Sequence, residues 1–579
     1  MALSSTQDFW FGPRLGGAET EFHLWAPVER AIAVEVEGRE PTALPSAALG
    51  RRAASVPGGA GTRYAFQLDS GPRIPDPASR AQDGDIGDAS LIVDPGSYRW
   101  QCESWRGRPW EATVLYELHV GLLGGFAGAA AHLGRVAALG FTAIELMPVA
   151  DFPGARNWGY DGVLPFAPDR AYGTPDDLKA LIDRAHTVGL MVFLDVVYNH
   201  FGPDGNWLPE YAPQFFRSDM KTPWGGAINF RQPMVRRFFI ENAIYWIHEF
   251  RLDGLRFDAV HAIRDRDFLI ELASQLRASV PDGRYVHLVL ENDDNDAQLL
   301  TCGFDAQWND DLHHALHVLL TGETSGYYED YARAPAEALA RALAEGFVYQ
   351  GEPSRHRGGA PRGTPSALLA PTSFVAFLQN HDQIGNRAFG ERLTTLANPG
   401  ALRAAVALQL LAPQIPLVFM GEEAGATEPF LYFTDYRNPG LAESVREGRR
   451  GDFARFREFS DPKRRERIPD PNAPATFERS RPSFDGSRAQ EWNDLYSALL
   501  GIRHRQIIPR LKGTQAVGAA ALSEAAVFAH WRLGDGATLS IAMNLGEAPA
   551  HGRFPDNEPI WGESCNILPA NSTVAWIDS

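Results

Sequence analysis

The feature that most constrains the fold of this chain is a series of eight apolar, β-rich runs. They are VLYELHV (114–120), FTAIELMPV (141–149), LMVFLDVV (190–197), LDGLRFDAV (252–260), VHLVLE (286–291), FDAQWN (304–309), SFVAFLQN (373–380) and IPLVFMGEE (415–423). Amphipathic stretches such as 176–189 and 267–280 separate several of them. Eight buried strands joined by helices predict a (β/α)8 TIM barrel with long loops. A doubly wound open sheet is the alternative, although no glycine-rich nucleotide-binding motif follows the first run.

The segments on either side of these runs have a different pattern. EFHLWAP (21–27), AIAVEVEG (31–38) and RYAFQLDSG (63–71) are strand-length runs bounded by Gly and Pro clusters. From about Lys512 the chain again becomes β-like, with AVFAHWRL (526–533) and ATLSIAMNL (537–545) on either side of a Gly-Asp-Gly turn. We therefore expect a multi-domain α/β chain: an N-terminal β-sandwich (1–100), a catalytic barrel (101–505) and a small C-terminal β-sandwich (506–579).

Composition excludes several classes of protein and partner. Apolar residues make up 44% and charged residues 22% of the 579 residues, which is ordinary globular usage rather than that of a disordered or disulfide-scaffold chain. The formal net charge of −18 argues against a nucleic-acid or anionic-membrane partner. Only three cysteines are present, no signal-peptide pattern opens the chain, and no run of about 20 apolar residues exists. We expect a cytoplasmic protein with reduced thiols.

Polar residues gather at the carboxyl ends of four predicted strands. They are Asp195 and His200 after the third run, Arg256 and Asp258 on the fourth, Glu291 ending the fifth, and His381 and Asp382 after the seventh. Any one of these carboxylates could simply cap a helix. In a barrel, however, these strand ends converge on the face that carries the active site. A cluster of three or more acids with histidine and arginine there indicates a catalytic centre.

Two chemistries suit such a cluster. Carboxylates and histidines could hold a divalent metal, or a pair of carboxylates could hydrolyse a glycosidic bond. Arg256 lies two residues before Asp258 and favours the second possibility. A neighbouring guanidinium keeps a carboxylate ionised, as a nucleophile requires, and competes with a metal for its oxygen atoms.

Four short segments resemble the characteristic sequence regions of the α-amylase family, glycoside hydrolase family 13. They are DVVYNH (195–200), GLRFDAVH (254–261), VHLVLE (286–291) and FLQNHD (377–382). The resemblance implies a retaining double displacement. In it Asp258 would be the nucleophile, Glu291 the general acid and then base, and Asp382 the transition-state stabiliser.

The same resemblance implies a set of substrate-binding residues. Arg256 would orient the nucleophile, and His200 and His381 would bind hydroxyl groups of the glucose at the cleavage point. Tyr160, in NWGYDG, would stack on that glucose ring. Asp195, with a mainly structural role, and His261 complete the set. The resemblance implies no cofactor and no obligatory metal, although Asn199 matches a position that binds calcium in some family members.

Longer segments resemble one branch of this family, over about residues 9–545. The segments include 76–90, 116–121, 157–179, 198–216, 307–323, 380–393 and 420–435. The branch hydrolyses the α-1,4 bond next to the terminal trehalose of maltooligosyl trehalose, a small-molecule oligosaccharide. The resemblance thus implies functional pairing with a maltooligosyl trehalose synthase. It also implies that the N-terminal sandwich is a family 48 carbohydrate-binding module.

The chain departs from the pattern of this branch in two places. LLGGFAGAAAHL (122–133) replaces a Thr- and Glu-containing stretch, and Asp85 and Asp88 stand where Val and Pro are usual. Other readings stay open: a branching, debranching or maltogenic enzyme of the same family, or a non-catalytic glucan-binding protein. His313 and His317, four residues apart, could suggest zinc, but no accompanying HExxH or CxxC motif exists.

Overall fold

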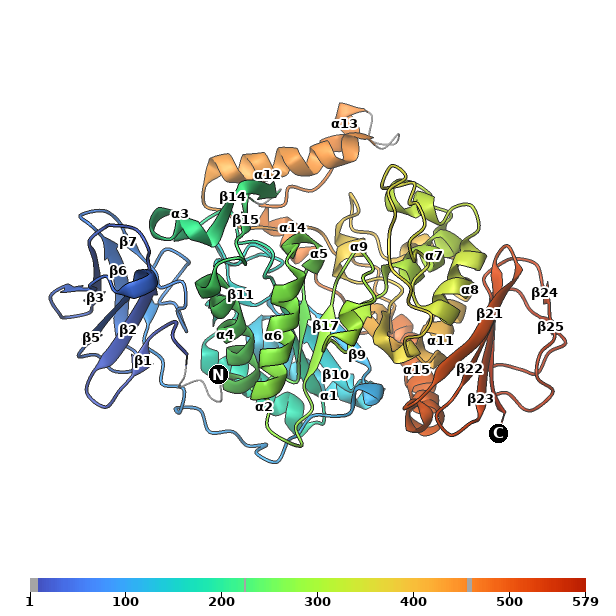
Figure 1. The fold of residues 1–579 in the computed structure, drawn as a ribbon. Coiled ribbons are helices and arrows are strands. Elements are labelled where there is room, and N and C mark those ends of the chain that lie inside the picture. The colour runs from blue at the N-terminus through green and yellow to red at the C-terminus, as the bar shows by residue number, and fades with distance from the viewer. Residues whose placement is uncertain (1–8, 223–224, 456–460, 579) are drawn as a thin grey trace.

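The centre of the computed structural model is a closed barrel of eight parallel strands (Figure 1). The structure describes residues 9–222, 225–455 and 461–578. The barrel strands are β9 (Leu115–Leu118), β10 (Ala143–Leu146), β13 (Met191–Val196), β16 (Gly254–Phe257), β17 (His287–Leu290), β18 (Ala306–Trp308), β19 (Phe374–Ala376) and β20 (Ile415–Phe419). They follow chain order around the barrel, and β20 pairs with β9 to close it. Each of the eight predicted runs contains one of these strands, so the barrel prediction is confirmed.

Alternation along the strands builds two apolar layers. Leu115, Ala143 and Met191 belong to a cluster inside the barrel, whereas Ile144 and Val192 belong to the larger core shared with the helices. Because successive side chains of a strand point to opposite faces, both faces of these strands are apolar. This explains why the runs are nearly continuous in hydrophobicity.

Helices surround the barrel. The long ones are α1 (Gly125–Leu139), α2 (Pro175–Thr187), α4 (Pro233–Glu249), α6 (Arg266–Ser279), α7 (Asp310–Thr321), α8 (Pro335–Glu345), α11 (Pro399–Leu411) and α15 (Ser487–Ile502). The short ones are α3 (Leu208–Tyr211), α5 (Val260–Ile263), α9 (His381–Gly385), α10 (Leu393–Leu396) and α14 (Pro474–Glu478). The sequence at the start of α2 shows why a helix begins there. Thr174 and Asp177 form a capping box, and Pro175 occupies the first helical position.

The N-terminal segment forms two packed antiparallel sheets, as expected. One contains β1 (Arg14–Leu15), β2 (Thr20–Trp25) and β5 (Arg51–Val56). The other contains β3 (Ile32–Val36), β4 (Thr42–Ala43), β6 (Arg63–Leu68), β7 (Arg73–Ile74) and β8 (Ser90–Leu91). Glu241 of α4 attaches the sandwich to the barrel by accepting backbone N–H bonds from Trp10 (2.9 Å) and Phe11 (3.0 Å).

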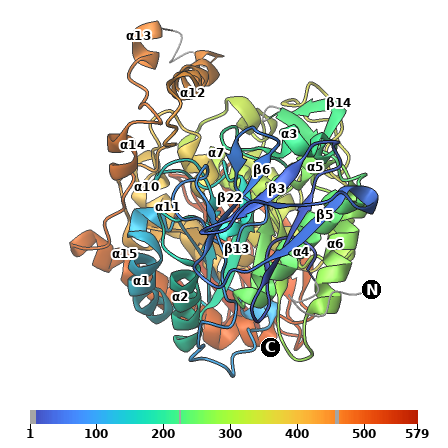
Figure 2. The ribbon, with the colours of Figure 1, turned by 90° about the vertical axis from the view of Figure 1, so that its left-hand side faces the viewer.

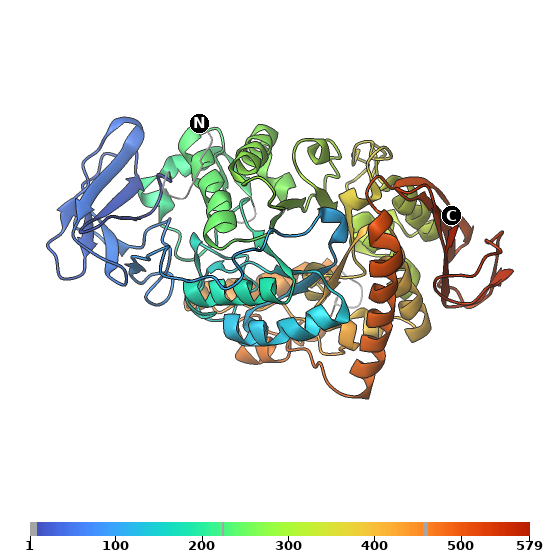
Figure 3. The same cartoon turned by 90° about the horizontal axis from the view of Figure 1, so that it is seen from below.

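The C-terminal segment is the sheet of β21 (Gln515–Ser523), β22 (Ala526–Arg532), β23 (Thr538–Asn544) and β26 (Ser572–Asp578). A small pair, β24 (Ala550–His551) and β25 (Ile567–Leu568), completes it. Trp531 and Thr573 donate hydrogen bonds to backbone carbonyls of α8 and α11. Figure 3 shows the two β units at opposite ends of the barrel. The boundaries 1–100, 101–505 and 506–579 stay predictions.

Long loop segments above the carboxyl ends of the barrel strands complete the fold. Two hairpins, β11 (Ala150–Asp151) with β12 (Leu164–Pro168) and β14 (Phe216–Thr222) with β15 (Gly225–Ile228), leave the barrel there. An arm of α12 (Pro439–Asp452) and α13 (Pro462–Arg465) stands above them (Figures 1 and 2). None of the helices within the described ranges is long and apolar enough to cross a membrane.

Candidate active site

The side chain of Arg256 organises the polar cluster at the carboxyl end of the barrel. It extends from β16 and is 2% exposed. Its Nη1 atom lies 2.7 Å from Asp195 Oδ2 and 2.8 Å from Asp258 Oδ1, and its Nη2 atom lies 3.6 Å from Glu291 Oε2. One guanidinium therefore joins acids from three neighbouring strands, as the strand-end argument predicted.

The backbone turn after β16 orients two of these acids. Ala259 has a φ of 42°, a left-handed conformation that costs a non-glycine residue free energy. In that conformation its N–H donates to Glu291 Oε2 at 2.5 Å. Asn199 Nδ2 donates to Asp258 Oδ2 at 2.7 Å. With Arg256 on the other oxygen, both oxygen atoms of Asp258 are held in place.

Glu291 is set apart from its neighbours by its protonation. Burial raises its pKa to about 8, and the charges of Asp258 and Asp382 add to this, while Arg256 and the Ala259 N–H oppose it. The carboxyl group therefore carries a proton at neutral pH. Its side chain is still 18% exposed, so a ligand can reach it. This is the environment that a general acid requires.

Tyr160, His381 and Asp195 form a second connected group. The Tyr160 hydroxyl donates to Asp195 Oδ2 at 2.6 Å and lies 2.8 Å from His381 Nε2, with the two rings stacked at 5.2 Å. His381 Nδ1 pairs with Glu117 of β9. Burial opposes a charge on His381, but the Glu117 carboxylate outweighs burial and raises the pKa of the imidazole. Tyr160 and Arg256 both donate to the same oxygen of Asp195, Oδ2, which holds this carboxylate behind them.

Asp382 lies in the first turn of α9. The Asn380 side chain caps this helix and accepts from the Asp382 N–H at 2.9 Å. Asn386 Nδ2 donates to Asp382 Oδ1 at 2.6 Å. At the other end of α9, Arg449 reaches down from the α12 arm and donates to Gly385 O at 2.5 Å. Burial and the charge of Asp258 raise the pKa of Asp382, against His381 and Arg256.

The two remaining predicted residues differ in position. His200 is buried, lies 2.9 Å from the backbone oxygen of Tyr160 and also contacts the Asn199 side chain, so it adjoins the cluster. His261 Nδ1 accepts from Asp293 N, two residues after Glu291, at 3.3 Å. The structure brings together Asp195, His200, Arg256, Asp258, Glu291, Tyr160, His381 and Asp382, and places His261 at the edge.

Comparisons with known proteins agree with this geometry. A family model described as "Alpha amylase, catalytic domain" matches residues 103–222, and one described as "Domain of unknown function (DUF3459)" matches residues 514–576. A malto-oligosyltrehalose trehalohydrolase of Deinococcus radiodurans is 41% identical over 501 residues, covering 85% of this chain and 82% of that protein. The chain belongs to the malto-oligosyltrehalose trehalohydrolase family.

Other relatives support membership of this trehalohydrolase family. The Saccharolobus solfataricus trehalohydrolase is 40% identical over 76% of this chain and 80% of its own length. The crystal structure of a candidate alpha amylase from Salmonella typhimurium has a TM-score of 0.93 and 42% identity, covering 99% of this chain and all of that one. A Paenibacillus barengoltzii pullulanase bound to maltotetraose has a TM-score of 0.72 at 20% identity, over 98% and 95% of the two chains, which shows the shared fold alone.

The sequence analysis did not identify several residues of this site. One is Glu117, which lies inside the first apolar run. A carboxylate among strand residues that are otherwise apolar could have indicated a site residue there. Asn199 was considered only for calcium, yet it binds Asp258. Asn386, four residues after Asp382, donates a hydrogen bond to its carboxylate. Arg449, on the α12 arm, donates to a backbone oxygen of α9, the helix that contains Asp382. Nothing in the sequence pattern connects Arg449 to α9.

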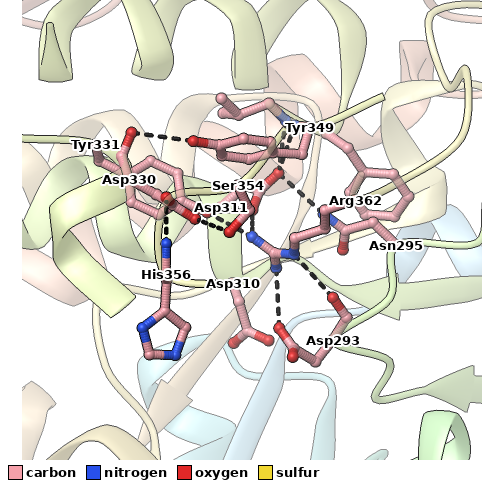
Figure 4. Close-up of polar contacts among 12 residues, drawn as sticks. Asp293, Asn295, Asp310, Asp311, Asp330, Tyr331, Tyr349, Ser354, His356 and Arg362 are labelled. Atoms are coloured by element: carbon pink, nitrogen blue, oxygen red, sulfur yellow. Dashed lines mark hydrogen bonds and ion pairs between the residues drawn. The ribbon is translucent and has the colours of Figure 1, made fainter. Parts of the chain in front are cut away.

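A second network is centred on the buried side chain of Arg362 (Figure 4). Arg362, from the loop after α8, lies between Asp293, with Nη2 to Oδ1 at 3.2 Å, and Asp311, with Nη1 to Oδ1 at 2.8 Å. The Tyr331 hydroxyl accepts from Arg362 and donates to Asp311. This network attaches the loop containing Arg362 to the segments that follow β17 and β18.

The described part of the chain contains no group of three or more His, Cys, Asp or Glu side chains arranged to hold a metal ion. The two histidines that suggested zinc have other partners. His313 Nδ1 lies 2.6 Å from Leu378 O, and His317 Nε2 lies 2.8 Å from Glu323.

Proposed function

We propose that this chain is a retaining glycoside hydrolase that cleaves the α-1,4-glucosidic bond next to the terminal trehalose of maltooligosyl trehalose. The products are trehalose and a malto-oligosaccharide. The observation that carries the chemistry is the pair Asp258 and Glu291 on one guanidinium, of which Glu291 retains its proton. The family relationship carries the substrate.

In the first step, Glu291 donates its proton to the glycosidic oxygen and trehalose leaves. The Asp258 carboxylate attacks the anomeric carbon and forms a glucosyl ester. Arg256 orients Asp258 for this attack through their ion pair.

In the second step, water hydrolyses the ester. Esterified Asp258 no longer carries the charge that helps to raise the pKa of Glu291. That pKa therefore falls, and Glu291 can take a proton from the attacking water. The released sugar has the original α configuration, and both carboxyl groups return to their starting states.

The surrounding side chains suit the glucose at the cleavage point. Tyr160 supplies a stacking surface. The Nε2 atoms of His200 and His381, which contact the Tyr160 backbone oxygen and hydroxyl, would also bind hydroxyl groups of this glucose. Asp382 places a carboxylate opposite the positive charge that develops in the transition state. His261 would contact the leaving side. We further infer that a maltooligosyl trehalose synthase supplies the substrate and that both act in the cytoplasm.

The test is product analysis with two substrates. Purified chain incubated with maltotriosyl trehalose should release trehalose rapidly, and it should attack maltopentaose slowly. Asp258→Asn is the control, and NMR of fresh product should show the α anomer first. Efficient cleavage of maltopentaose without trehalose release would point instead to another α-amylase-family activity.

A further inference from the structure

A cleft of about 600 Å³ lies between the N-terminal sandwich and the barrel. It is formed by segments that are far apart in the sequence: 85–88 of the sandwich, 204–210 of the barrel loop that includes the start of α3, and Pro153 and Arg437. Figure 1 shows α3 between the sandwich and the barrel, on the side where the strands end. The volume lies within the range of about 300–1,000 Å³ that ligand pockets occupy.

Asp85 holds the walls of this cleft together. Its Oδ1 atom accepts from Gly154 N at 3.1 Å, and its Oδ2 atom pairs with Arg437 Nη2 at 2.9 Å. Gly205, with a φ of +79°, lets the barrel loop approach Ile86 so closely that a Cβ atom would lie 2.3 Å from its side chain. The walls are therefore in fixed contact, and the cleft is a formed feature.

The lining combines one flat aromatic group with polar groups. Trp207 is half-buried, with part of its ring against the core and part on the cleft. Asp88, Asp204, Asn206 and Arg437 supply carboxylate, amide and guanidinium groups. An apolar ring face beside hydrogen-bonding groups suits a neutral polyhydroxyl ligand. The excess of carboxylates disfavours an anionic one.

A line of contacts connects this cleft to the candidate active site. Tyr436 is buried next to Arg437, and its hydroxyl bonds to Asp161, the residue after Tyr160. Burial and the negative charges of Asp161 and Asp204 raise the pKa of Tyr436, which places Asp204 of the cleft near the same hydroxyl. Tyr436 and Asp161 thus connect the lining of the cleft to the segment that carries Tyr160.

We propose that this interdomain cleft binds the glucose units of the malto-oligosyl chain that lie farthest from the cleaved bond. The N-terminal sandwich and the barrel would then jointly determine the preference for substrate length. The proposal rests on the proposed function for the identity of that chain. It gives Asp85 and Asp88, which depart from the pattern of the branch that this sequence resembles, a place in substrate recognition.

The experiment compares full-length wild type with Trp207→Ala and Arg437→Ala. The readout is the ratio of kcat/KM for maltopentaosyl trehalose to kcat/KM for maltosyl trehalose. Trp207→Ala should lower this ratio about tenfold, as expected for loss of one aromatic anchor. Arg437→Ala, at an exposed side chain, should lower it by a smaller factor without unfolding the chain. Tyr285→Ala removes an exposed aromatic ring that precedes β17, at the other end of the barrel, and should leave the ratio unchanged.

A binding measurement separates this proposal from the proposed function. Calorimetry with maltohexaose in an Asp258→Asn background needs no turnover, and adding Trp207→Ala should weaken binding about tenfold. If wild type releases no trehalose but this loss of binding is seen, the proposed function fails and the cleft stands. An unchanged ratio and unchanged binding would overturn the cleft proposal. So would a calcium-dependent rise in Tm that Asp85→Ala abolishes, which would make the cleft a cation site.

Discussion

Two arginine–carboxylate networks lie side by side at the carboxyl end of the barrel, and they differ in the acids that contact each arginine most closely. Arg256 is 2% exposed and Arg362 is 5% exposed. Asp311, the main partner of Arg362, is fully buried and accepts from five groups. These are Arg362, Tyr331, Asn295 Nδ2, Val348 N and Tyr349 N. Asp258 and Glu291, the partners of Arg256, remain 13% and 18% exposed.

The difference shows that burial and ion pairing do not by themselves identify a catalytic group. The donors around Asp311 are all used to connect loops, which is what a structural network requires. Around Arg256 the acids have few donors and a free side, and Glu291 keeps a proton that it can transfer. Exposure separates Asp311 from Asp258 and Glu291. Protonation separates Glu291 from the half-exposed Asp293: burial opposes a charge on Asp293, but Arg362 and Arg357 outweigh burial and lower its pKa.

The largest expected effect on kcat comes from replacing Asp258 or Glu291. Asp258→Asn should lower kcat by about four orders of magnitude, because the nucleophile is lost. Glu291→Gln should lower it about 10²- to 10⁴-fold, because the proton donor is lost. Steady-state kinetics on maltotriosyl trehalose, with Tm as a check on folding, measures both. Asp311→Asn is the matched variant in the other network, and a similar loss of kcat there would remove the distinction.

The second prediction concerns the stability of the Arg362 network. Arg362→Met leaves Asp311 as a buried charge without its main counter-ion, and it should cost about 3–5 kcal/mol of unfolding free energy. Scanning calorimetry of the barrel transition measures this. Arg357→Met is the control, since Arg357 pairs with the half-exposed Asp293 and Asp294 and should cost about 1 kcal/mol or less. Equal effects would mean that the buried arginine has no special role.

The protonation of Glu291 gives the third prediction. As pH rises through about 8, Glu291 loses the proton that it must donate, so kcat/KM should fall with an alkaline limb near that value. The raised pKa also affects folding: the stability that it contributes is highest below the unfolded-state value of about 4.5 and is lost as pH rises toward 8. Glu291→Gln should therefore gain stability relative to wild type over that pH range. An alkaline limb near pH 6 would contradict both expectations.

The two networks also differ in how far the sequence could predict them. The barrel strands and the acids at their ends were predictable because apolar runs and strand ends are local signals. β5 was not predicted, because RRAASV lacks apolar alternation. The Arg362 network joins Asp311, in the first turn of α7, to three loop residues, Asp293, Tyr331 and Arg362. No periodicity could bring these positions together. Arg449 reaches α9 from the arm, and only the folded chain shows that contact.

The smallest expected effect tests whether the α12 arm belongs to the catalytic network. Arg449 Nη2 donates to Gly385 O and Arg387 O, and so holds the end of α9. Asn386, which the same guanidinium approaches at 3.4 Å, donates to Asp382. Arg449→Met keeps most of the side-chain volume but releases these carbonyls, so kcat should fall about three- to tenfold while KM changes less.

Arg450→Met is the control for this substitution. Arg450 is the next residue of α12, and its guanidinium pairs with Glu447 on the same arm. If both variants lower kcat equally, the arm acts as a whole and not through α9. If only Arg449→Met does, and Asn386→Ala reproduces the loss without adding to it in the double variant, then Arg449 and Asn386 position Asp382 along one path. The Arg256 network would then extend to the arm, whereas the Arg362 network would end at the loops that it connects.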